Sequence, residues 1–192
     1  MTQKRSASTG SQPSIRSGLL AAIPSLRAFA MALTNDLSRA DDLVQETILR
    51  AWQNQDRFEP GSNLGAWLFT ILRNLFYSHL RRMKREFADP DGSYAAQLRT
   101  APDQEAGVIA KDMWRALGEL PPDQREALLL VGAEGMSYDE AARICGVAVG
   151  TIKSRVNRAR RRLAEHLEIE DARELGADRV VLAALQEGTE TR

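Results

Sequence analysis

The chain has 192 residues, with 26 basic side chains, 26 acidic side chains and a formal net charge of zero. This length suits one large or two small domains, and a single cysteine, Cys145, excludes a fold held by disulfides. No stretch approaches the roughly 18 apolar residues of a membrane span, and the N-terminus lacks the apolar core of a signal peptide. We therefore expect a soluble, cytoplasmic protein with no membrane partner.

The neutral net charge hides a segregated charge distribution. Basic side chains cluster at 81–85 and 153–162, whereas acidic side chains gather at 36–46, 89–105 and 165–190. Such segregation creates local fields of opposite sign. Zero net charge therefore does not exclude a nucleic-acid partner.

The first third of the chain predicts a tail and two helices. Residues 1–17 are rich in Ser, Thr, Gln and Gly, which is typical of a disordered tail. A helix is expected over 19–33, although Pro24 fits it only in the first turn. A second helix should begin with a capping box of Ser38 and Asp41. Its predicted buried side chains, at helical spacing, are Ala40, Val44, Ile48, Ala51 and Trp52.

The outward face of that second helix carries Asp42, Gln45, Glu46 and Leu49. It can be a plain acidic surface, which the helix macrodipole favours near an N-terminus. An exposed leucine beside acids equally suits a docking face for a basic partner. The residues alone leave these two interpretations open.

Residues 56–64 predict a loop that can hold a ligand or a base, because Pro60, Gly61, Ser62 and Asn63 follow one another. A helix is expected over 64–85. Its predicted buried face comprises Leu68, Ile71, Leu72, Leu75 and Phe76, with Trp67 beside them, and its other face comprises Thr70, Arg73, Asn74, Tyr77, Ser78 and Arg81. Guanidinium groups for phosphates, with amide and aromatic groups for bases, are typical of proteins that read single-stranded DNA.

Residues 86–106 predict a flexible linker, because they contain Pro90, Gly92 and Pro102 and few large apolar side chains. Further helices are expected from Ile109 to Leu120 and over 123–134. No segment alternates with period two, so we predict an all-α protein of two small helical domains. The acidic tail over 168–192 has no predicted role.

Residues 137–163 have the order of a helix-turn-helix unit. Ser137 and Glu140 predict a capping box, and Gly146 predicts the turn after the first helix. The second helix starts near Val149 and carries an apolar stripe of Ile152, Val156, Ala159 and Leu163. Its other side is basic, with Thr151, Ser154, Arg155, Arg158 and Arg162 flanked by Lys153, Arg160 and Arg161.

No carboxylate interrupts residues 153–162, whereas solvated helix faces usually alternate acids and bases. This basic face therefore predicts an anionic partner. A solubilising face on a protein-binding helix is the alternative. No metal, cofactor or enzymatic site is expected, because His79 and His166 lie on separate helices without the spacing of metal ligands.

Three segments together resemble the extracytoplasmic-function (ECF) group of bacterial RNA polymerase sigma factors. They are ADDLVQETILRAW (40–52), AWLFTILRNLFYSHLRR (66–82) and LPPDQREALLLVGAEGMSYDEAARICGVAVGTIKSRVNRARRRL (120–163). The resemblance covers 19–167 and is nearest to the general-stress-response subgroup. It implies sigma region 2 at 18–85 and sigma region 4 at 107–167, between the tail at 1–17, the linker at 86–106 and the tail at 168–192.

The resemblance implies a protein without catalytic activity that binds core polymerase and directs recognition of the −10 and −35 promoter elements. The docking set, which would meet the clamp helices of the largest polymerase subunit, is Asp41, Asp42, Gln45, Glu46 and Leu49. The −10 set is Asn63, Arg73, Asn74, Tyr77, Arg81 and Arg82, and the 56–64 loop would capture a flipped base. The −35 set is Thr151, Lys153, Ser154, Arg155, Arg158 and Arg162. An anti-sigma protein is the further expected partner.

Two other classes of protein are weaker interpretations. A simple helix-turn-helix regulator would leave the docking set and the helix over 64–85 unexplained. A sigma-like decoy that binds only an anti-sigma protein should have lost its basic residues, yet both basic faces are present.

Overall fold

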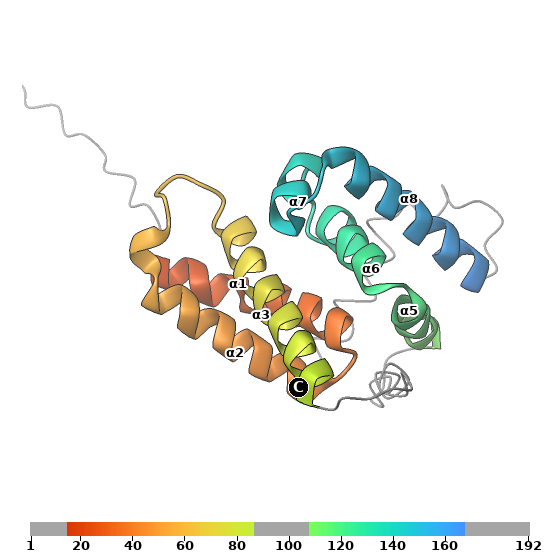
Figure 1. Ribbon diagram of the computed structural model, residues 1–192, viewed down its shortest axis with the longest axis horizontal. Coiled ribbons are helices and arrows are strands. Elements are labelled where there is room, and N and C mark those ends of the chain that lie inside the picture. Colours follow the sequence, from red (N-terminus) through yellow and green to blue (C-terminus); the bar gives the residue numbers. More distant parts are fainter. Residues whose placement is uncertain (1–14, 87–107, 168–192) are drawn as a thin grey trace, which may run out of the picture.

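A computed structural model of the chain describes residues 15–86 and 108–167 (Figure 1). Within these two ranges the chain forms helices and no strand, which confirms the predicted all-α fold. The predicted tails and linker lie outside the described residues, apart from the residues at their edges. The tail prediction is wrong for residues 15–17, since the first helix already begins at Ile15.

The N-terminal domain consists of α1 (Ile15–Thr34), α2 (Leu37–Gln53) and α3 (Leu64–Glu86), with the short helix η1 (Gln55–Arg57) in the connecting loop. Phe29 and Phe69 are almost completely buried in its core, and their rings meet edge to face with centroids 5.0 Å apart. Pro24 lies well inside α1 rather than in its first turn. Contrary to expectation, α1 is long and apolar enough to cross a membrane, but half of that window is buried within the protein, as in a core helix.

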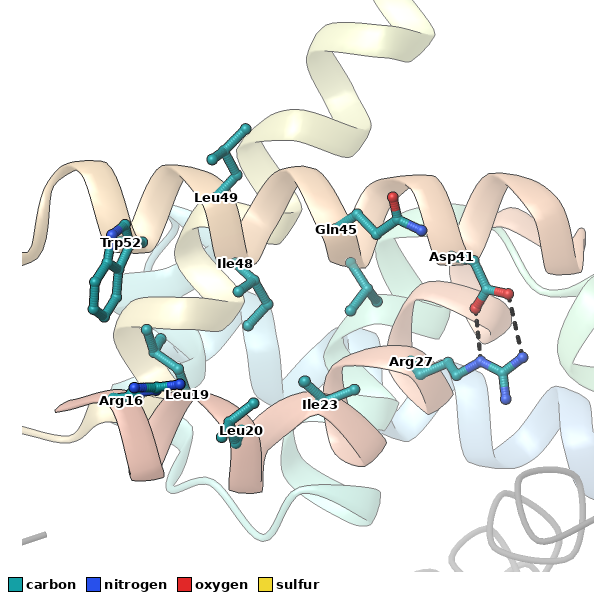
Figure 2. Close-up of a pocket in the computed structure, with 11 residues that line it drawn as sticks. Arg16, Leu19, Leu20, Ile23, Arg27, Asp41, Gln45, Ile48, Leu49 and Trp52 are labelled. Carbon is teal, nitrogen blue, oxygen red and sulfur yellow. Dashed lines mark hydrogen bonds and ion pairs between the residues drawn. The ribbon is translucent and has the colours of Figure 1, made fainter. Parts of the chain in front are cut away.

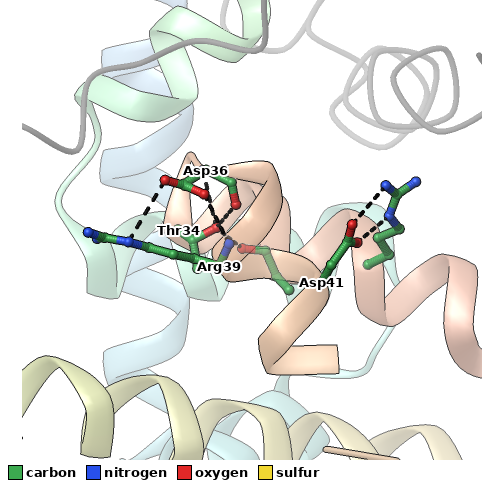
Figure 3. Close-up of polar contacts among 6 residues, drawn as sticks. Thr34, Asp36, Arg39 and Asp41 are labelled. Atoms are coloured by element: carbon green, nitrogen blue, oxygen red, sulfur yellow. Dashed lines mark hydrogen bonds and ion pairs between the residues drawn. The ribbon is translucent and has the colours of Figure 1, made fainter. Parts of the chain in front are cut away.

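The connection between α1 and α2 shows that α2 begins earlier than predicted, with Asp36 as its cap (Figure 3). Asn35 adopts a left-handed backbone conformation, with φ of 52°, and reverses the chain. Asp36 then caps α2 by accepting a hydrogen bond from the Arg39 N–H at 2.9 Å. The predicted Ser38–Asp41 capping box is therefore wrong, because Ser38 already lies inside the helix. Asp41 instead accepts hydrogen bonds from the Arg27 guanidinium, the shorter at 2.6 Å.

Burial along α2 follows the predicted spacing at most positions. Ala40, Val44 and Ala51 are buried, and Ile48 packs against the core while partly exposed. The prediction for Trp52 is wrong, since its side chain remains 47% exposed. Trp52 lies in the last turn of α2, where its ring lines a surface groove rather than the core.

The C-terminal domain consists of α5 (Val108–Glu119), α6 (Pro122–Leu128), the π-helical turn η2 (Leu129–Ala133), α7 (Tyr138–Cys145) and α8 (Val149–His166). The helix predicted over 123–134 is thus α6 continued by a π turn. The four residues of the predicted stripe on α8, from Ile152 to Leu163, are almost completely buried. This stripe packs α8 against α6 and α7.

The helix-turn-helix unit has the predicted caps. The Ser137 side chain accepts a hydrogen bond from the Glu140 N–H, and the Glu140 carboxylate accepts one from the Ser137 N–H at 3.0 Å. Gly146 ends α7 in a left-handed conformation, with φ of 66°. Cys145 beside it is buried, and burial raises the pKa of its thiol to about 12.

The two domains pack against each other, α3 against α7 and α1 against α5 and α6 (Figure 1). Arg125 on α6 is buried in this contact. Its Nη1 donates to the Ala32 carbonyl of α1 at 3.0 Å, and its Nη2 donates to the carbonyls of Gly118 and Leu120 at 2.7 and 2.9 Å. Burial lowers the pKa of Arg125 to about 10, so its guanidinium remains charged at neutral pH.

We predict that Gly146→Ala lowers the free energy of unfolding by about 1 kcal/mol, the typical cost of holding an L-residue in the left-handed region. An added Cβ would meet no atom within 4 Å, so this conformational cost stands alone. The measurement is the urea midpoint followed by circular dichroism. Gly150→Ala is the matched control, because Gly150 is helical and equally open, and alanine there should stabilise α8 by up to about 1 kcal/mol. Equal midpoints for the two variants would contradict the prediction.

Candidate functional site

The basic face of α8 is open to solvent at most of its predicted residues. Lys153 and Arg158 are exposed, and Lys153 Nζ lies 5.9 Å from the centroid of the Tyr138 ring. Thr151, Ser154 and Arg162 are partly exposed, and the Ser154 hydroxyl donates to the Thr151 carbonyl of the same helix. The structure therefore places most of the −35 set on solvent-accessible parts of a single helix.

Arg155 is the exception within the −35 set. Its side chain is only 19% exposed, and its Nε lies 3.1 Å from Asp123 Oδ2 on α6. This guanidinium is already neutralised within its own domain. Arg155 can contact a phosphate only by sharing or exchanging that carboxylate.

The start of α8 is suited to an anion. Ala148 occupies the N-cap position and, in the part of the chain that the structure describes, makes no side-chain capping bond. The first amide N–H groups of a helix carry the positive end of its dipole and need partners from outside the helix. A phosphate can supply them.

The docking set on α2 divides into exposed and paired side chains. Asp42, Gln45 and Leu49 are exposed, with Leu49 at 54%. Asp41 is held by Arg27, as described above. Glu46 accepts a hydrogen bond from Arg50 Nη2 at 2.8 Å and lies 3.1 Å from His79 Nε2 of α3.

An apolar groove of about 890 Å³ runs between α1 and α2 next to the docking set (Figure 2). Leu19, Leu20, Ile23, Ile48 and Trp52 line it, and the Arg27–Asp41 pair closes one end. Periodicity alone did not predict this groove, because it lies between two helices. Its signal is that Leu20, Leu49 and Trp52, three of the large apolar side chains left exposed, all gather along it.

The −10 set is divided between solvent and the other domain. Asn74, Arg81 and Arg82 are exposed on α3. Arg73 and Tyr77 instead contact Glu126 of α6. Arg73 Nε lies 2.5 Å from Glu126 Oε1, and the Tyr77 hydroxyl donates to Glu126 Oε2 at 3.1 Å.

The loop over 56–64 is also engaged by the C-terminal domain. Asn63 Oδ1 accepts from the Ala66 N–H and caps α3, while its Nδ2 donates to Glu140 Oε1 of the capping box at 2.8 Å. Phe58 packs on Trp67 with ring centroids 5.4 Å apart. Packing at Phe58 and hydrogen bonds at Asn63 thus hold the two ends of the loop.

Sequence reasoning missed Arg125 and Glu126. Glu126 is completely buried, and burial raises the pKa of its carboxyl group while Arg73 and Tyr77 oppose that rise. Burial also raises the pKa of the Tyr77 hydroxyl. The signal was present as two adjacent charged residues directly before the apolar run ALLLV, where helical neighbours are buried. Among the described residues, no group of three or more His, Cys, Asp or Glu side chains is arranged to hold a metal ion.

Residues 20–86 match the family model for Sigma-70 region 2, and residues 110–163 match the model for Sigma-70, region 4. ECF RNA polymerase sigma factor EcfG from Rhodopseudomonas palustris is 58% identical, covering 90% of this chain and 95% of its own length. ECF RNA polymerase sigma factor SigC from Mycobacterium tuberculosis is 37% identical, covering 73% of this chain and 77% of its own length.

Two solved structures are similar as well. Sigma factor RpoE from Bartonella quintana, in complex with the anti-sigma factor NepR, is 51% identical with a TM-score of 0.74, covering 82% of this chain and 98% of that one. CnrH, in complex with the cytosolic domain of CnrY, is 26% identical with a TM-score of 0.61, covering 85% and 93%. With both sigma regions matched and nearly its full length shared with a curated relative, the chain belongs to the family of ECF RNA polymerase sigma factors.

Proposed function

We propose that this sigma factor binds core RNA polymerase and promoter DNA together and so sets where transcription starts. The observation that carries this function is the basic face of α8, held outward by a capped helix-turn-helix unit whose apolar stripe is buried. Transcription with core polymerase on a library of short promoters tests it directly. Productive templates should share two conserved elements, and a template pool without shared elements would contradict the proposal.

The −35 set contacts the upstream element through α8. Lys153 and Arg158 are the exposed cations of this set, and the uncapped start of α8 adds amide N–H groups for a phosphate. Thr151 and Ser154 lie on the same helix at the spacing of base-edge contacts in a major groove. Arg155 contributes less to DNA affinity than its sequence position suggests, since it shares its charge with Asp123.

We predict that Arg158→Ala weakens binding to a duplex taken from the productive templates and lowers the slope of log K against log salt by about one unit. The physical reason is the loss of one phosphate contact and of the counterions that it releases. Fluorescence anisotropy between low and moderate salt measures the slope. Arg115→Ala on α5 is the matched control, because it removes an exposed arginine outside the basic face. An unchanged slope for Arg158→Ala would remove this residue from the interface.

The docking set binds the clamp helices of the largest polymerase subunit. Asp42, Gln45 and Leu49 are its directly accessible members, and they combine a carboxylate, an amide and an apolar anchor on one face of α2. Asp41 and Glu46 shape this face through their pairs with Arg27, Arg50 and His79. The adjacent apolar groove enlarges the surface available to a helical partner.

We predict that the double variant Asp42→Lys, Leu49→Ala loses affinity for core polymerase by about tenfold or more, since it removes an apolar anchor and reverses an accessible charge. Co-elution with core polymerase and competition binding measure the loss, while binding of the isolated protein to duplex DNA should persist. Glu119→Lys is the control, because it makes the same charge change at an exposed position of α5. Full retention of polymerase binding by the double variant would exclude this face.

The −10 set meets the downstream element of the promoter. Asn74, Arg81 and Arg82 are exposed on α3, and Arg73 and Tyr77 add a second cation and an aromatic ring to the same helix. Asn63 and the 56–64 loop capture the flipped base. Flipping costs a few kcal/mol of stacking, which contacts of this kind must offset.

An anti-sigma protein is the further partner that we infer, and we infer a role in the general stress response. The support is the 51% likeness to the Bartonella quintana factor that was solved with an anti-sigma factor, together with the likeness to EcfG. The protein acts in the cytoplasm and has no catalytic activity of its own. A helix-turn-helix regulator or a decoy explains less, because neither needs the docking set and the −10 set together.

A further inference from the structure

Region 4 covers two members of the −10 set on α3, Arg73 and Tyr77. The Glu126 carboxylate is the centre of this contact, with Arg73 Nε at 2.5 Å from one oxygen and the Tyr77 hydroxyl at 3.1 Å from the other. Arg73 also lies over the Tyr77 ring, with its guanidinium carbon 4.7 Å from the centroid. One carboxylate of region 4 thereby engages two of the six −10 residues.

A second contact of the same kind lies at the N-terminus of α3. Asn63, a third member of the −10 set, donates to Glu140 of α7 at 2.8 Å. Arg125 adds a third contact, between α6 and the last turn of α1. Acids of region 4 therefore occupy polar groups of Arg73, Tyr77 and Asn63 that would otherwise contact DNA, and of these three residues Asn63 stays exposed.

The Glu126 carboxylate is oriented toward the other domain. In the described residues, both groups that contact its oxygens belong to α3 of region 2. From region 4, Arg155 and Cys145 lie near this cluster, and Arg155 is itself paired with Asp123. A fully buried carboxylate needs a cation to offset its lost hydration, and Arg73 supplies that charge.

The two other surfaces remain open in the same structure. Asp42 and Leu49 of the docking set are exposed, as are Lys153 and Arg158 of the −35 set. Polymerase and duplex DNA can therefore meet the closed protein, whereas Arg73 and Tyr77 are only partly exposed and remain paired with Glu126 until the domains separate.

We propose that Glu126 is a latch that holds the free sigma factor closed and withholds Arg73 and Tyr77 of its −10 set from DNA. The latch rests on the proposed role of that set. Because only the open form offers Arg73 and Tyr77, the apparent affinity for single-stranded DNA falls as the open fraction of molecules falls. Docking on polymerase then precedes exposure of Arg73 and Tyr77, which confines strand capture by the complete −10 set to the assembled enzyme.

The test uses full-length protein and two measurements. Small-angle X-ray scattering gives the radius of gyration, and anisotropy gives the affinity for a fluorescein-labelled, random-sequence 12-nucleotide single-stranded DNA pool. Glu126→Ala and Arg73→Met each break the pair from one side and should increase the radius. Glu126→Ala, which keeps all six −10 residues, should also bind the DNA pool roughly tenfold more tightly, as its open fraction rises.

Two further variants separate a latch from a general loss of structure. The double variant Arg73→Met, Glu126→Leu replaces the pair by apolar groups of similar volume and should return the radius toward the wild-type value. Tyr77→Phe removes one hydroxyl and keeps the ring, so it should increase the radius of gyration less than Arg73→Met does. It replaces Arg73→Met as the test variant if Arg73→Met loses its helical circular dichroism signal. Glu119→Ala removes an exposed acid of region 4 and should change neither measurement.

The outcomes distinguish the latch from the function of the surface that it covers. An unchanged radius in both Glu126→Ala and Arg73→Met would overturn the latch and leave the −10 assignment intact. Expansion of Glu126→Ala without tighter binding of the DNA pool would overturn the withholding of DNA contacts and count against the −10 assignment itself. Expansion with tighter binding, absent in Glu119→Ala, supports the proposal.

Discussion

A carboxylate that is fully removed from water is stable only where protein groups replace its hydration, and the arrangement of this molecule depends on how Glu126 meets that requirement. Its replacements come from Arg73 and Tyr77, on a helix of the other domain. The preceding residue, Arg125, is a buried cation that needs hydrogen-bond acceptors. It donates to carbonyl groups at the end of α1 and just before α6. Two adjacent residues of α6 thus fix both the internal order of region 4 and its placement on region 2.

The elements that the sequence predicted best are those whose determinants are local. The capping box at Ser137, the turn at Gly146 and the buried stripe of α8 depend on residues within one or two turns of each other, and the structure contains all three. The start of α2 was predicted incorrectly because Asp36 and Ser38 are both good capping residues. The choice between them is made by the left-handed backbone of Asn35, which no spacing rule reveals.

The surfaces were harder to predict than the helices. Helical periodicity separates an apolar face from a polar one, but it does not show what covers the polar face. Arg73 and Tyr77 lie on the polar face of α3, as predicted, yet they are partly buried because their partner lies far along the chain in another domain. Trp52 shows the converse, since an apolar residue at helical spacing stays exposed where two helices diverge around a groove. Such pairings are properties of the tertiary structure.

The bond from Arg125 to the Ala32 carbonyl joins residues 93 positions apart and has a consequence during synthesis. Domains generally fold as they leave the ribosome, N-terminal first. The three helices of region 2 are therefore complete while Arg125 and Glu126 are still being translated. For that interval the nascent chain presents Arg73 and Tyr77 uncovered, so each newborn molecule passes through an open form before it matures into the closed one.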